Sequence, residues 1–225
     1  MENRSVALDG PSAAGKSTLA RRAAKNFGYI YVDTGALYRC IGLYTLRNNV
    51  GSKDEQGVVR LLSGINLEIV YDETMEQRMI LNAEDVTDLI RTPEASMYAS
   101  DISAMPPVRG YLLSMQRELA VKNNVVMDGR DIGTVVLPDA GLKVFITASP
   151  EVRVQRRYLE LIARNIDTTL EDVEYDLITR DKNDSERQAA PLRVADDAVV
   201  LDTTDMDLDE SFVALCDLIT GRFGK

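Results

Sequence analysis

The sequence predicts an α/β protein whose core is a parallel β-sheet covered by helices on both faces. Short apolar strands alternate with helical stretches along most of the 225 residues, which is the order that a parallel sheet requires. A glycine-containing turn joins the first predicted strand to the first predicted helix. Two charged segments interrupt the alternation, but no Gly/Ser-rich linker or repeat separates them from the rest. We therefore predict one domain with insertions rather than two independent domains.

The chain opens with a strand and a helix. Residues 6–8 form a short apolar run, and Leu19, Ala23 and Phe27 then follow at helical spacing. Gly28 suits the C-cap position, so the first helix is predicted to end there. The same pattern recurs downstream, with strands predicted over residues 29–32, 125–127, 142–146 and 198–201 and a second helix over 35–46.

The two interruptions differ in character. The strand-like runs 65–71 and 79–81 are joined by a polar turn with no room for a crossover helix, so antiparallel pairing is predicted. Together with a helix that begins at Pro93, they form a predicted insertion over about residues 63–102. The second interruption, residues 153–193, is helical, highly charged and rich in Arg.

Charge and composition exclude several classes of protein. The net charge of −10 argues against a general nucleic-acid or anionic-membrane surface. The chain contains no His, which excludes histidine acid–base catalysis, phosphohistidine chemistry and Ser-His hydrolysis. Cys40 and Cys216 match no metal-ligand spacing. The first residues lead directly into a strand-like run, so no signal peptide or membrane span is predicted and a reducing cytoplasm is expected.

A phosphate-binding motif lies between the first strand and the first helix. Residues 10–17 read Gly-Pro-Ser-Ala-Ala-Gly-Lys-Ser and match G-x-x-x-x-G-K-[ST] in the strand–turn–helix context that the motif requires. Backbone N–H groups and the helix N-terminus are suited to surround a β-phosphate. Lys16 is predicted to bridge the β- and γ-phosphates, and the Ser17 hydroxyl to ligate Mg²⁺. ATP is the predicted ligand of this loop.

The motif alone does not distinguish a kinase from an ATP-hydrolysing switch, motor or transporter. The sequence lacks the N-K-x-D motif with which guanine-nucleotide switches read their base. The L-S-G-G-Q motif of transporter ATPases breaks off at residues 62–65. Residues 125–128 could serve as a Walker-B strand, so an ATP-hydrolysing switch stays open as the alternative.

Three clusters place Arg beside acidic residues, at positions 33–39, 128–131 and 180–187. Each lies just after a predicted strand or in the Arg-rich segment, and each alone also fits a surface ion-pair network. A planar guanidinium can hold phosphate through two parallel hydrogen bonds. The joint occurrence of the clusters with the phosphate-binding loop favours a second phosphate site, and hence a phosphotransferase.

At these residues the chain resembles the bacterial cytidylate kinases, nucleoside monophosphate kinases that act on CMP and dCMP. The resemblance covers nearly the whole chain and rests on residues 10–12, 33–39 and 128–134 and on Arg180, Asp181, Asp184, Ser185, Arg187, Pro191 and Leu192. It implies a single P-loop kinase domain over residues 1–225 with a core sheet, an inserted part that binds the nucleoside monophosphate and a mobile LID. The implied boundaries are 1–62, 103–152 and 194–225 for the core, about 63–102 for the insertion and about 153–193 for the LID.

The resemblance also implies an activity and roles for individual residues. The implied reaction transfers the γ-phosphate of ATP to CMP or dCMP, in pyrimidine nucleotide metabolism, with Mg²⁺ as cofactor. The residues implied to bind ATP are Gly10, Pro11, Ser12, Ala13, Ala14, Gly15, Lys16, Ser17 and Thr18, with Arg156 and Arg157 closing over the phosphates. Those implied to hold the acceptor phosphate are Thr34, Arg39, Arg130 and Arg187, with Arg180 and Asp184 near the ribose and Ser100, Arg109 and Asp131 on cytosine. The implied catalytic residues are Lys16, Arg130, Arg157 and Arg187.

Two residues depart from the family pattern. Ala13 stands where many relatives have Gly, and it is expected to be tolerated if its φ stays negative. Thr34 stands where many relatives have Ser, and it keeps the hydroxyl.

Elementary chemistry agrees with the implied reaction. A monophosphate with a second pKa near ~6 is largely dianionic at neutral pH and needs no general base, so a site without His is no handicap. The carboxylate of Asp131 can accept from the exocyclic amine of cytosine but would face the carbonyl oxygen of uracil. The expected partners are these nucleotides, without nucleic acid or membrane, and the chain is expected to be a monomer.

Overall fold

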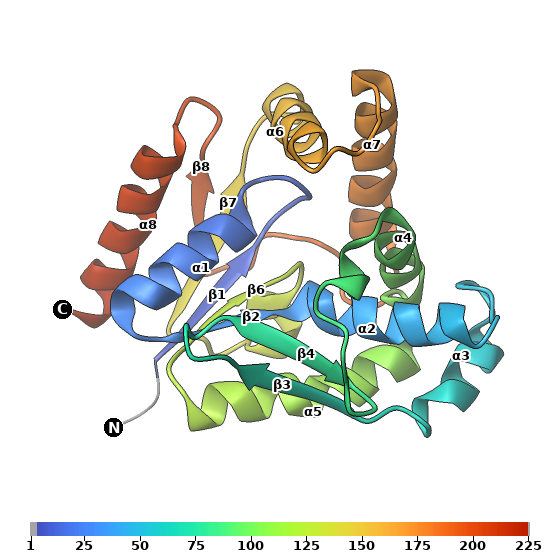
Figure 1. The fold of residues 1–225 in the computed structure, drawn as a ribbon. Helices are drawn as coiled ribbons and strands as arrows, with labels where there is room; N and C mark the ends of the chain where they lie inside the picture. Colours follow the sequence, from blue (N-terminus) through green and yellow to red (C-terminus); the bar gives the residue numbers. More distant parts are fainter. Residues whose placement is uncertain (1–3, 225) are drawn as a thin grey trace.

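The computed structural model describes residues 4–224, and its centre is a five-stranded sheet with the strand order β2-β6-β1-β7-β8 (Figure 1). These strands are β1 (Ser5–Asp9), β2 (Ile30–Asp33), β6 (Val125–Asp128), β7 (Leu142–Thr147) and β8 (Val199–Asp202). Every neighbouring pair is parallel. The carboxyl ends of all five strands therefore meet at one edge, which is where ligands bind in sheets of this kind.

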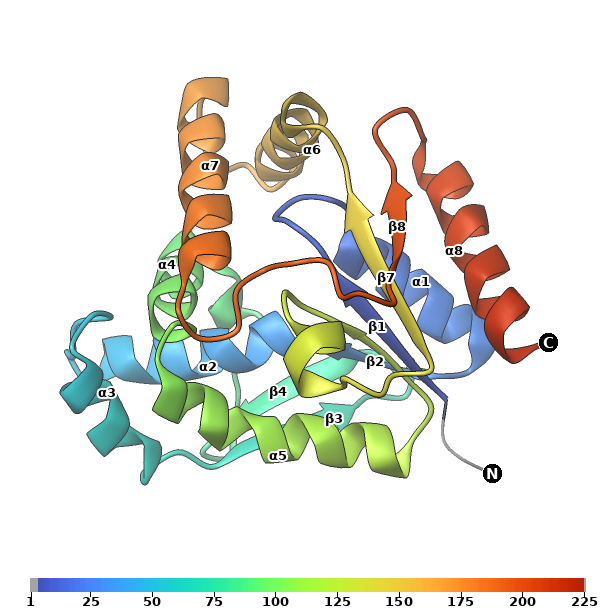
Figure 2. The ribbon, with the colours of Figure 1, turned by 180° about the vertical axis from the view of Figure 1, so that it is seen from behind.

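Helices cover both faces of this sheet, and the alternation along β1 explains why. Val6 and Leu8 pack on the face covered by α1 (Lys16–Phe27) and α8 (Leu208–Phe223), whereas Ala7 packs on the face covered by α5 (Pro106–Lys122). Figure 1 shows α1 and α8 on one side, and Figure 2 shows α5 on the other. All three β1 side chains are fully buried, as expected for a central strand.

The segment from the end of β2 to α4 adds an antiparallel sheet and a group of helices. The sheet consists of β3 (Leu67–Tyr71), β4 (Gln77–Leu81) and β5 (Glu84–Asp85), and the helices are α2 (Thr34–Arg47), α3 (Glu55–Leu62), the short η1 (Leu89–Arg91) and α4 (Pro93–Ile102). Helix α4 approaches α2 closely because Gly42 has no side chain. A Cβ there would come within 3.0 Å of the Cβ of Tyr98.

Two side chains of this insertion attach to the outer edge of β2. The Tyr71 hydroxyl donates to the carbonyl of Tyr31 at 2.9 Å, and the Asp33 N–H donates to Oε1 of Gln77 at 2.8 Å. These backbone groups belong to the edge of β2 that faces away from β6, so no further strand of the sheet pairs with them. The insertion is thus joined to the core sheet here through side chains.

Two helices stand above the carboxyl edge of the sheet in both views, α6 (Pro150–Ala163) and α7 (Leu170–Glu186) (Figures 1 and 2). They share a small apolar cluster of Leu161, Val173 and Leu177. Arg164, just after α6, donates to the carbonyl of Arg91 at 2.8 Å and so links this pair of helices to the insertion.

The structure confirms the predicted α/β class, the parallel sheet and the antiparallel pairing in the middle of the chain. The helix predicted to begin at Pro93 and the cap at Gly28, with φ of 65°, are also present. Helix α3 and strand β5 were not predicted from the sequence. Within residues 4–224 no helix is both long enough and apolar enough to cross a membrane.

Candidate active site

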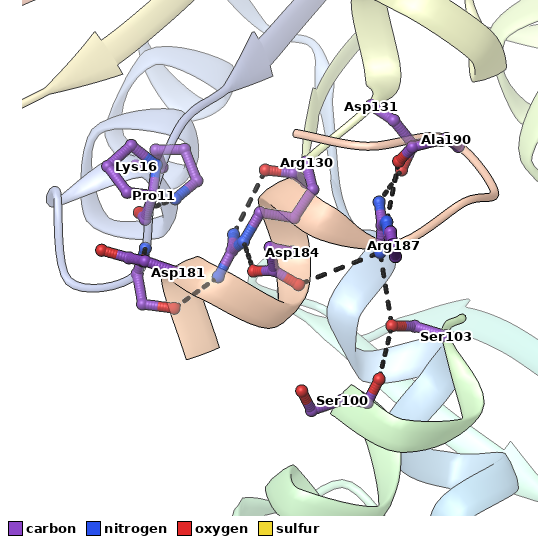
Figure 3. A network of polar contacts seen from close by, with 12 residues as sticks. Pro11, Lys16, Ser100, Ser103, Arg130, Asp131, Asp181, Asp184, Arg187 and Ala190 are labelled. Carbon is purple, nitrogen blue, oxygen red and sulfur yellow. Dashed lines mark hydrogen bonds and ion pairs between the residues drawn. The ribbon is translucent and has the colours of Figure 1, made fainter. Parts of the chain in front are cut away.

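The carboxyl edge of the sheet brings together the segments that the sequence singled out. Strand β1 leads into residues 10–15, β6 leads into residues 129–131, and β2 leads directly into α2. Helix α7 lies across the same edge, and Figure 3 shows its Asp181 and Asp184 beside the loop that carries Lys16.

The loop after β1 has the backbone that a phosphate-binding loop needs. Gly10 has a φ of 147°, and a Cβ there would come within 1.9 Å of the carbonyl oxygen of Ile146, so only glycine fits. Gly15, with φ of 87°, forms the N-cap of α1. Ser17 and Thr18 are exposed in the first turn of that helix. The helix N-terminus and these donors favour an anion.

Lys16 is buried, and its Nζ donates to the carbonyl of Pro11 at 2.7 Å. Burial lowers the pKa of Lys16 to about 7, and the neighbouring Arg130 acts in the same direction. A polyanion in the loop would favour the charged form and raise this pKa again.

Ser17 and Asp128 place two oxygen donors side by side. The Ser17 hydroxyl donates to Oδ2 of Asp128 at 2.6 Å, and the Tyr31 hydroxyl donates to Oδ1 at 3.0 Å. Burial and the nearby Asp33 raise the pKa of Asp128 to about 6, so it is ionised above neutral pH. Hard oxygen ligands suit Mg²⁺. In the described part of the chain no three His, Cys, Asp or Glu side chains gather as a metal site. Mg²⁺ is commonly bound by one or two protein oxygens together with substrate phosphates and water.

Ala13 corrects an expectation. Its φ is +59°, so it adopts the left-handed region instead of keeping φ negative. Its methyl group packs against the apolar cluster of α6 and α7. The left-handed conformation is sterically unfavourable for alanine but not for glycine, and the apolar contact of the methyl group offsets part of this strain.

Arg130 joins the phosphate-binding loop to α7. Its Nε donates to Oδ2 of Asp184 at 2.7 Å (Figure 3). Its Nη2 donates to the Ser12 hydroxyl at 2.8 Å. Asp184 is buried. The guanidinium therefore lies between the loop and the residues expected to hold the acceptor.

Asp131 is contacted by two of the predicted acceptor residues. It pairs with Arg109 and, at 3.0 Å, with Arg187, whose side chain is only 5% exposed. Burial raises the pKa of Asp131 even though both guanidiniums oppose the shift. Arg187 also donates to the hydroxyl of Ser103 at 3.3 Å, and that hydroxyl donates to the carbonyl of Ser100 at 2.8 Å (Figure 3). Ser100, Arg109, Asp131 and Arg187 are thus brought together, with Ser103 as a member that the sequence did not indicate.

Thr34 and Arg39 lie at the start of α2. The Thr34 hydroxyl donates to the carbonyl of Asp128 at 2.7 Å, and Arg39 pairs with Asp33 at 2.8 Å. Although burial alone would raise it, Arg39 and the Ala36 N–H keep the pKa of Asp33 below its ordinary value.

Among residues 4–224, the guanidinium of Arg180, in α7, forms no hydrogen bond and no ion pair. Burial lowers the pKa of Arg180, and the positive charges of Arg157 and Arg130 add to that effect, whereas the carboxylates of Asp176 and Asp184 oppose it. Arg157 pairs with Glu160 at 2.8 Å. A group of like charges in a chain of net charge −10 is an arrangement that an anion would stabilise.

Arg156 does not join this group. Its guanidinium donates to the carbonyls of Thr203 at 2.8 Å and Met206 at 3.2 Å, on the loop between β8 and α8. The expectation that it closes over the ATP phosphates is therefore not supported by its position, because its donors are directed to that loop.

Besides Ser103, the sequence analysis missed Asp9 and Arg153, and it gave no individual role to Asp181 within the 180–187 cluster. Asp9 accepts from the N–H groups of Ile132 and Gly133, both at 2.7 Å, and so fixes the π-helix η2 (Ile132–Val136) that follows Asp131. Burial raises the pKa of Asp9. Arg153 and Asp181 contact Ser12 of the phosphate-binding loop. Of these residues, only Asp9 could have been indicated by its position in the sequence, because it ends β1 directly before the phosphate-binding motif.

Comparisons with known proteins give consistent results. A family model described as cytidylate kinase matches residues 6–220. A cytidylate kinase from Carboxydothermus hydrogenoformans is 45% identical over 214 residues, which cover 95% of this chain and 96% of that relative. A cytidylate kinase from Caldicellulosiruptor bescii is 46% identical over 210 residues, covering 93% and 92%.

A solved structure of an uncharacterized protein from Eubacterium ventriosum superposes with a TM-score of 0.54 at 10% sequence identity, covering 98% of this chain and 100% of that one. At this identity the similarity concerns the fold alone.

Proposed function

The chain belongs to the cytidylate kinase family, and from that premise we propose that it transfers the γ-phosphate of ATP to CMP or dCMP, giving ADP and CDP or dCDP. The observation that carries the proposal is the group of guanidiniums at the edge of the sheet: Arg130 donates to Ser12 of the phosphate-binding loop, and Arg187 and Arg109 pair with the adjacent Asp131. Such a group would hold two polyanions together, which is the main difficulty of phosphoryl transfer between nucleotides.

The residues at the edge of the sheet can do this chemistry without a general base. The acceptor phosphate is already a nucleophile at neutral pH, so alignment and charge neutralisation are the tasks that remain. Lys16 would bind the β- and γ-phosphates, Arg130 would stabilise charge between donor and acceptor, and Arg157 and Arg180 would add charge from α6 and α7. Arg187 would hold the acceptor phosphate after exchanging its bond to Asp131 for one to that phosphate.

The proposed cofactor is Mg²⁺, which when bound with ATP would neutralise charge on the β- and γ-phosphates. Ser17 would supply a direct oxygen ligand, and Asp128 would act through its bond to Ser17 or through water. The buried Tyr31 hydroxyl holds Asp128 in this orientation.

We also propose the family's three-part division for this chain. Helices α6 and α7 form the LID, and the antiparallel sheet with α4 forms the part that binds the monophosphate. Closure of the LID would keep water away from the γ-phosphate and suppress hydrolysis. A monomer in the cytoplasm is the proposed form.

The decisive test of the proposed function is ADP release with ATP and one acceptor at a time. The acceptors are AMP, CMP, GMP, UMP, dCMP, TMP and shikimate. The proposal predicts ADP production that depends on the acceptor and is highest with CMP or dCMP. Equal ADP production with and without acceptor would instead favour an ATP-hydrolysing switch.

We expect Asp131→Asn to reduce the preference for CMP over UMP by roughly tenfold, because a carboxamide can rotate to donate to the uracil carbonyl. The Asp131 carboxylate and the Arg109 guanidinium lie together and match the amine and ring nitrogen of cytosine. The measurement is kcat/KM for both nucleotides, with a thermal melt to verify folding. If both substrates lose activity equally, Asp131 acts by holding Arg109 and Arg187 rather than by reading the base.

We expect ATP binding to take up a proton between pH 7.5 and 9. Lys16, with its pKa lowered to about 7, is largely neutral in that range, and ATP must raise this pKa to gain the charged form. The affinity for ATP should therefore fall as pH rises, by up to about tenfold per pH unit. Calorimetry in two buffers of different ionisation enthalpy measures the uptake. A dissociation constant that is constant over this range, with no proton uptake, would contradict the assigned role of the Lys16 charge.

A further inference from the structure

Ser12, the third residue of the phosphate-binding loop, uses all three of its polar groups within the protein. Its N–H donates to Oδ1 of Asp181 at 3.2 Å, and its carbonyl accepts from Nη1 of Arg153 at 3.1 Å. Its hydroxyl accepts from Arg130 at 2.8 Å. The N–H and the carbonyl of Ser12 are therefore both engaged by the helices α6 and α7, and these two bonds fix the orientation of the Ser12 peptide units.

Arg153 connects the loop to both helices of the LID. It belongs to α6, is buried, and donates through Nε to the carbonyl of Ala148 at 3.1 Å. Its Nη1 also donates to Oδ2 of Asp181 in α7 at 2.5 Å. The Arg153 guanidinium thus links α6, α7 and the loop. The Asp181 carboxylate that it contacts also binds Ser12 of the loop.

Apolar packing supplies a second, independent connection at the next residue. Ala13 packs its methyl group against the α6 and α7 cluster that contains Leu161 and Leu177, and it does so in the left-handed region that alanine rarely adopts. The backbone at residues 12–13 is therefore held by the LID helices through polar and apolar contacts.

We propose that Arg153 and Asp181 are positioning residues that orient the Ser12 and Ala13 backbone of the phosphate-binding loop, so that the affinity for ATP depends on the placement of α6 and α7. The inference rests on the proposed function only in that CMP serves as the comparison ligand. How the loop is held for ATP does not depend on which acceptor the enzyme uses. The two side chains act through the loop and do not touch the transferring phosphate. Without them the loop would have to be ordered by ATP itself, which costs binding free energy.

The experiment compares the dissociation constant for MgATP, measured by calorimetry without acceptor, in wild type, Asp181→Asn, Asp181→Ala and Arg153→Lys. Glu174→Gln is the matched control, because Glu174 is an exposed carboxylate on the same helix. We expect Asp181→Ala and Arg153→Lys to weaken ATP binding by about tenfold or more, since each removes charged hydrogen bonds to the loop. Asp181→Asn keeps an acceptor for the Ser12 N–H and should give a smaller loss. CMP binding should change less than about twofold.

Two further readouts separate positioning from a general structural role. Hydrogen exchange at residues 12–14 should become faster in Asp181→Ala, while exchange in the central strands stays the same. The double variant Arg153→Lys with Asp181→Ala should weaken ATP binding hardly more than either single variant, because the two residues act on one peptide. The proposal would be overturned if Asp181→Asn and Asp181→Ala were folded and bound MgATP with the same dissociation constant as Glu174→Gln. A wild-type protein that binds ATP but does not phosphorylate CMP would contradict the proposed function and leave this comparison intact.

Discussion

Replacing Lys16 with methionine is expected to lower phosphoryl transfer by about 10³-fold or more while leaving the folded protein at least as stable as wild type. The loss of activity follows because the ammonium is the one Lys charge inside the phosphate-binding loop and methionine cannot replace it. A charge that meets the transferring group inside a site shielded from water contributes several kcal/mol to the transition state.

The expectation that Lys16→Met is at least as stable toward unfolding as wild type has a separate cause. Burial lowers the pKa of Lys16 from 10.5 to about 7, so the charged form costs free energy on folding. Because the pKa is lower in the folded state, this cost is fully present below pH 7 and fades as the pH rises toward 10.5. Methionine fills similar space without the charge, so its advantage should be largest at pH 7 and below.

Thermal melts between pH 6 and 10 and the ADP-release assay provide the measurements. Lys25→Met is the matched control, because Lys25 is exposed on the same helix α1 and should change neither activity nor the trend with pH. A folded Lys16→Met protein with near-normal turnover would rule out the assigned role of the loop. A melting temperature well below wild type at pH 7 would show instead that Lys16 is needed to hold the loop.

Arg130→Ala is expected to lower kcat by roughly 10²–10³-fold with a much smaller change in KM for ATP. The guanidinium bonds both the loop, through Ser12, and α7, through Asp184, so it lies where donor and acceptor phosphates would meet. Negative charge shared between the two phosphates grows during transfer, and a planar guanidinium can bridge them while a shorter side chain cannot.

The control for this variant is Arg60→Ala, which removes an exposed Arg from α3. Steady-state kinetics with varied ATP and varied CMP separate kcat from the two KM values. A change confined to KM for CMP would mean that Arg130 only binds the acceptor. Unchanged kinetics would reduce it to a structural partner of Asp184.

Much of the fold could be predicted because its strands are short and apolar and its helices carry caps that the sequence displays. Helix α3 could not be predicted in this way. It has only eight residues, including Gly57 and the β-branched Val58 and Val59, and its start depends on Asp54, whose side chain accepts from the Gly57 N–H. Strand β5 is two residues long, which is too short for any periodicity to appear.

The candidate site likewise contains residues that could be predicted from the sequence and residues that could not. The phosphate-binding loop is contiguous, so its motif and context were sufficient. Arg153 and Asp181 lie 141 and 169 residues from Ser12, and only the tertiary structure brings them to it. Arg156 and Arg157 are adjacent in sequence but point about 100° apart on a helix, so one reaches the β8–α8 loop while the other pairs with Glu160 on the same helix.

The attachment of the insertion to β2 has a consequence for solubility. A strand at the border of a sheet presents free backbone groups that can recruit another chain. Tyr71 and Gln77 occupy such groups on Tyr31 and Asp33, so the hairpin also shields one border of the core sheet from self-association. The opposite border, β8, is protected differently, because it has only four residues and carries Asp202 at its end. Shortening the hairpin between β3 and β4 would therefore expose a surface that favours aggregation, even where the nucleotide site itself stayed intact.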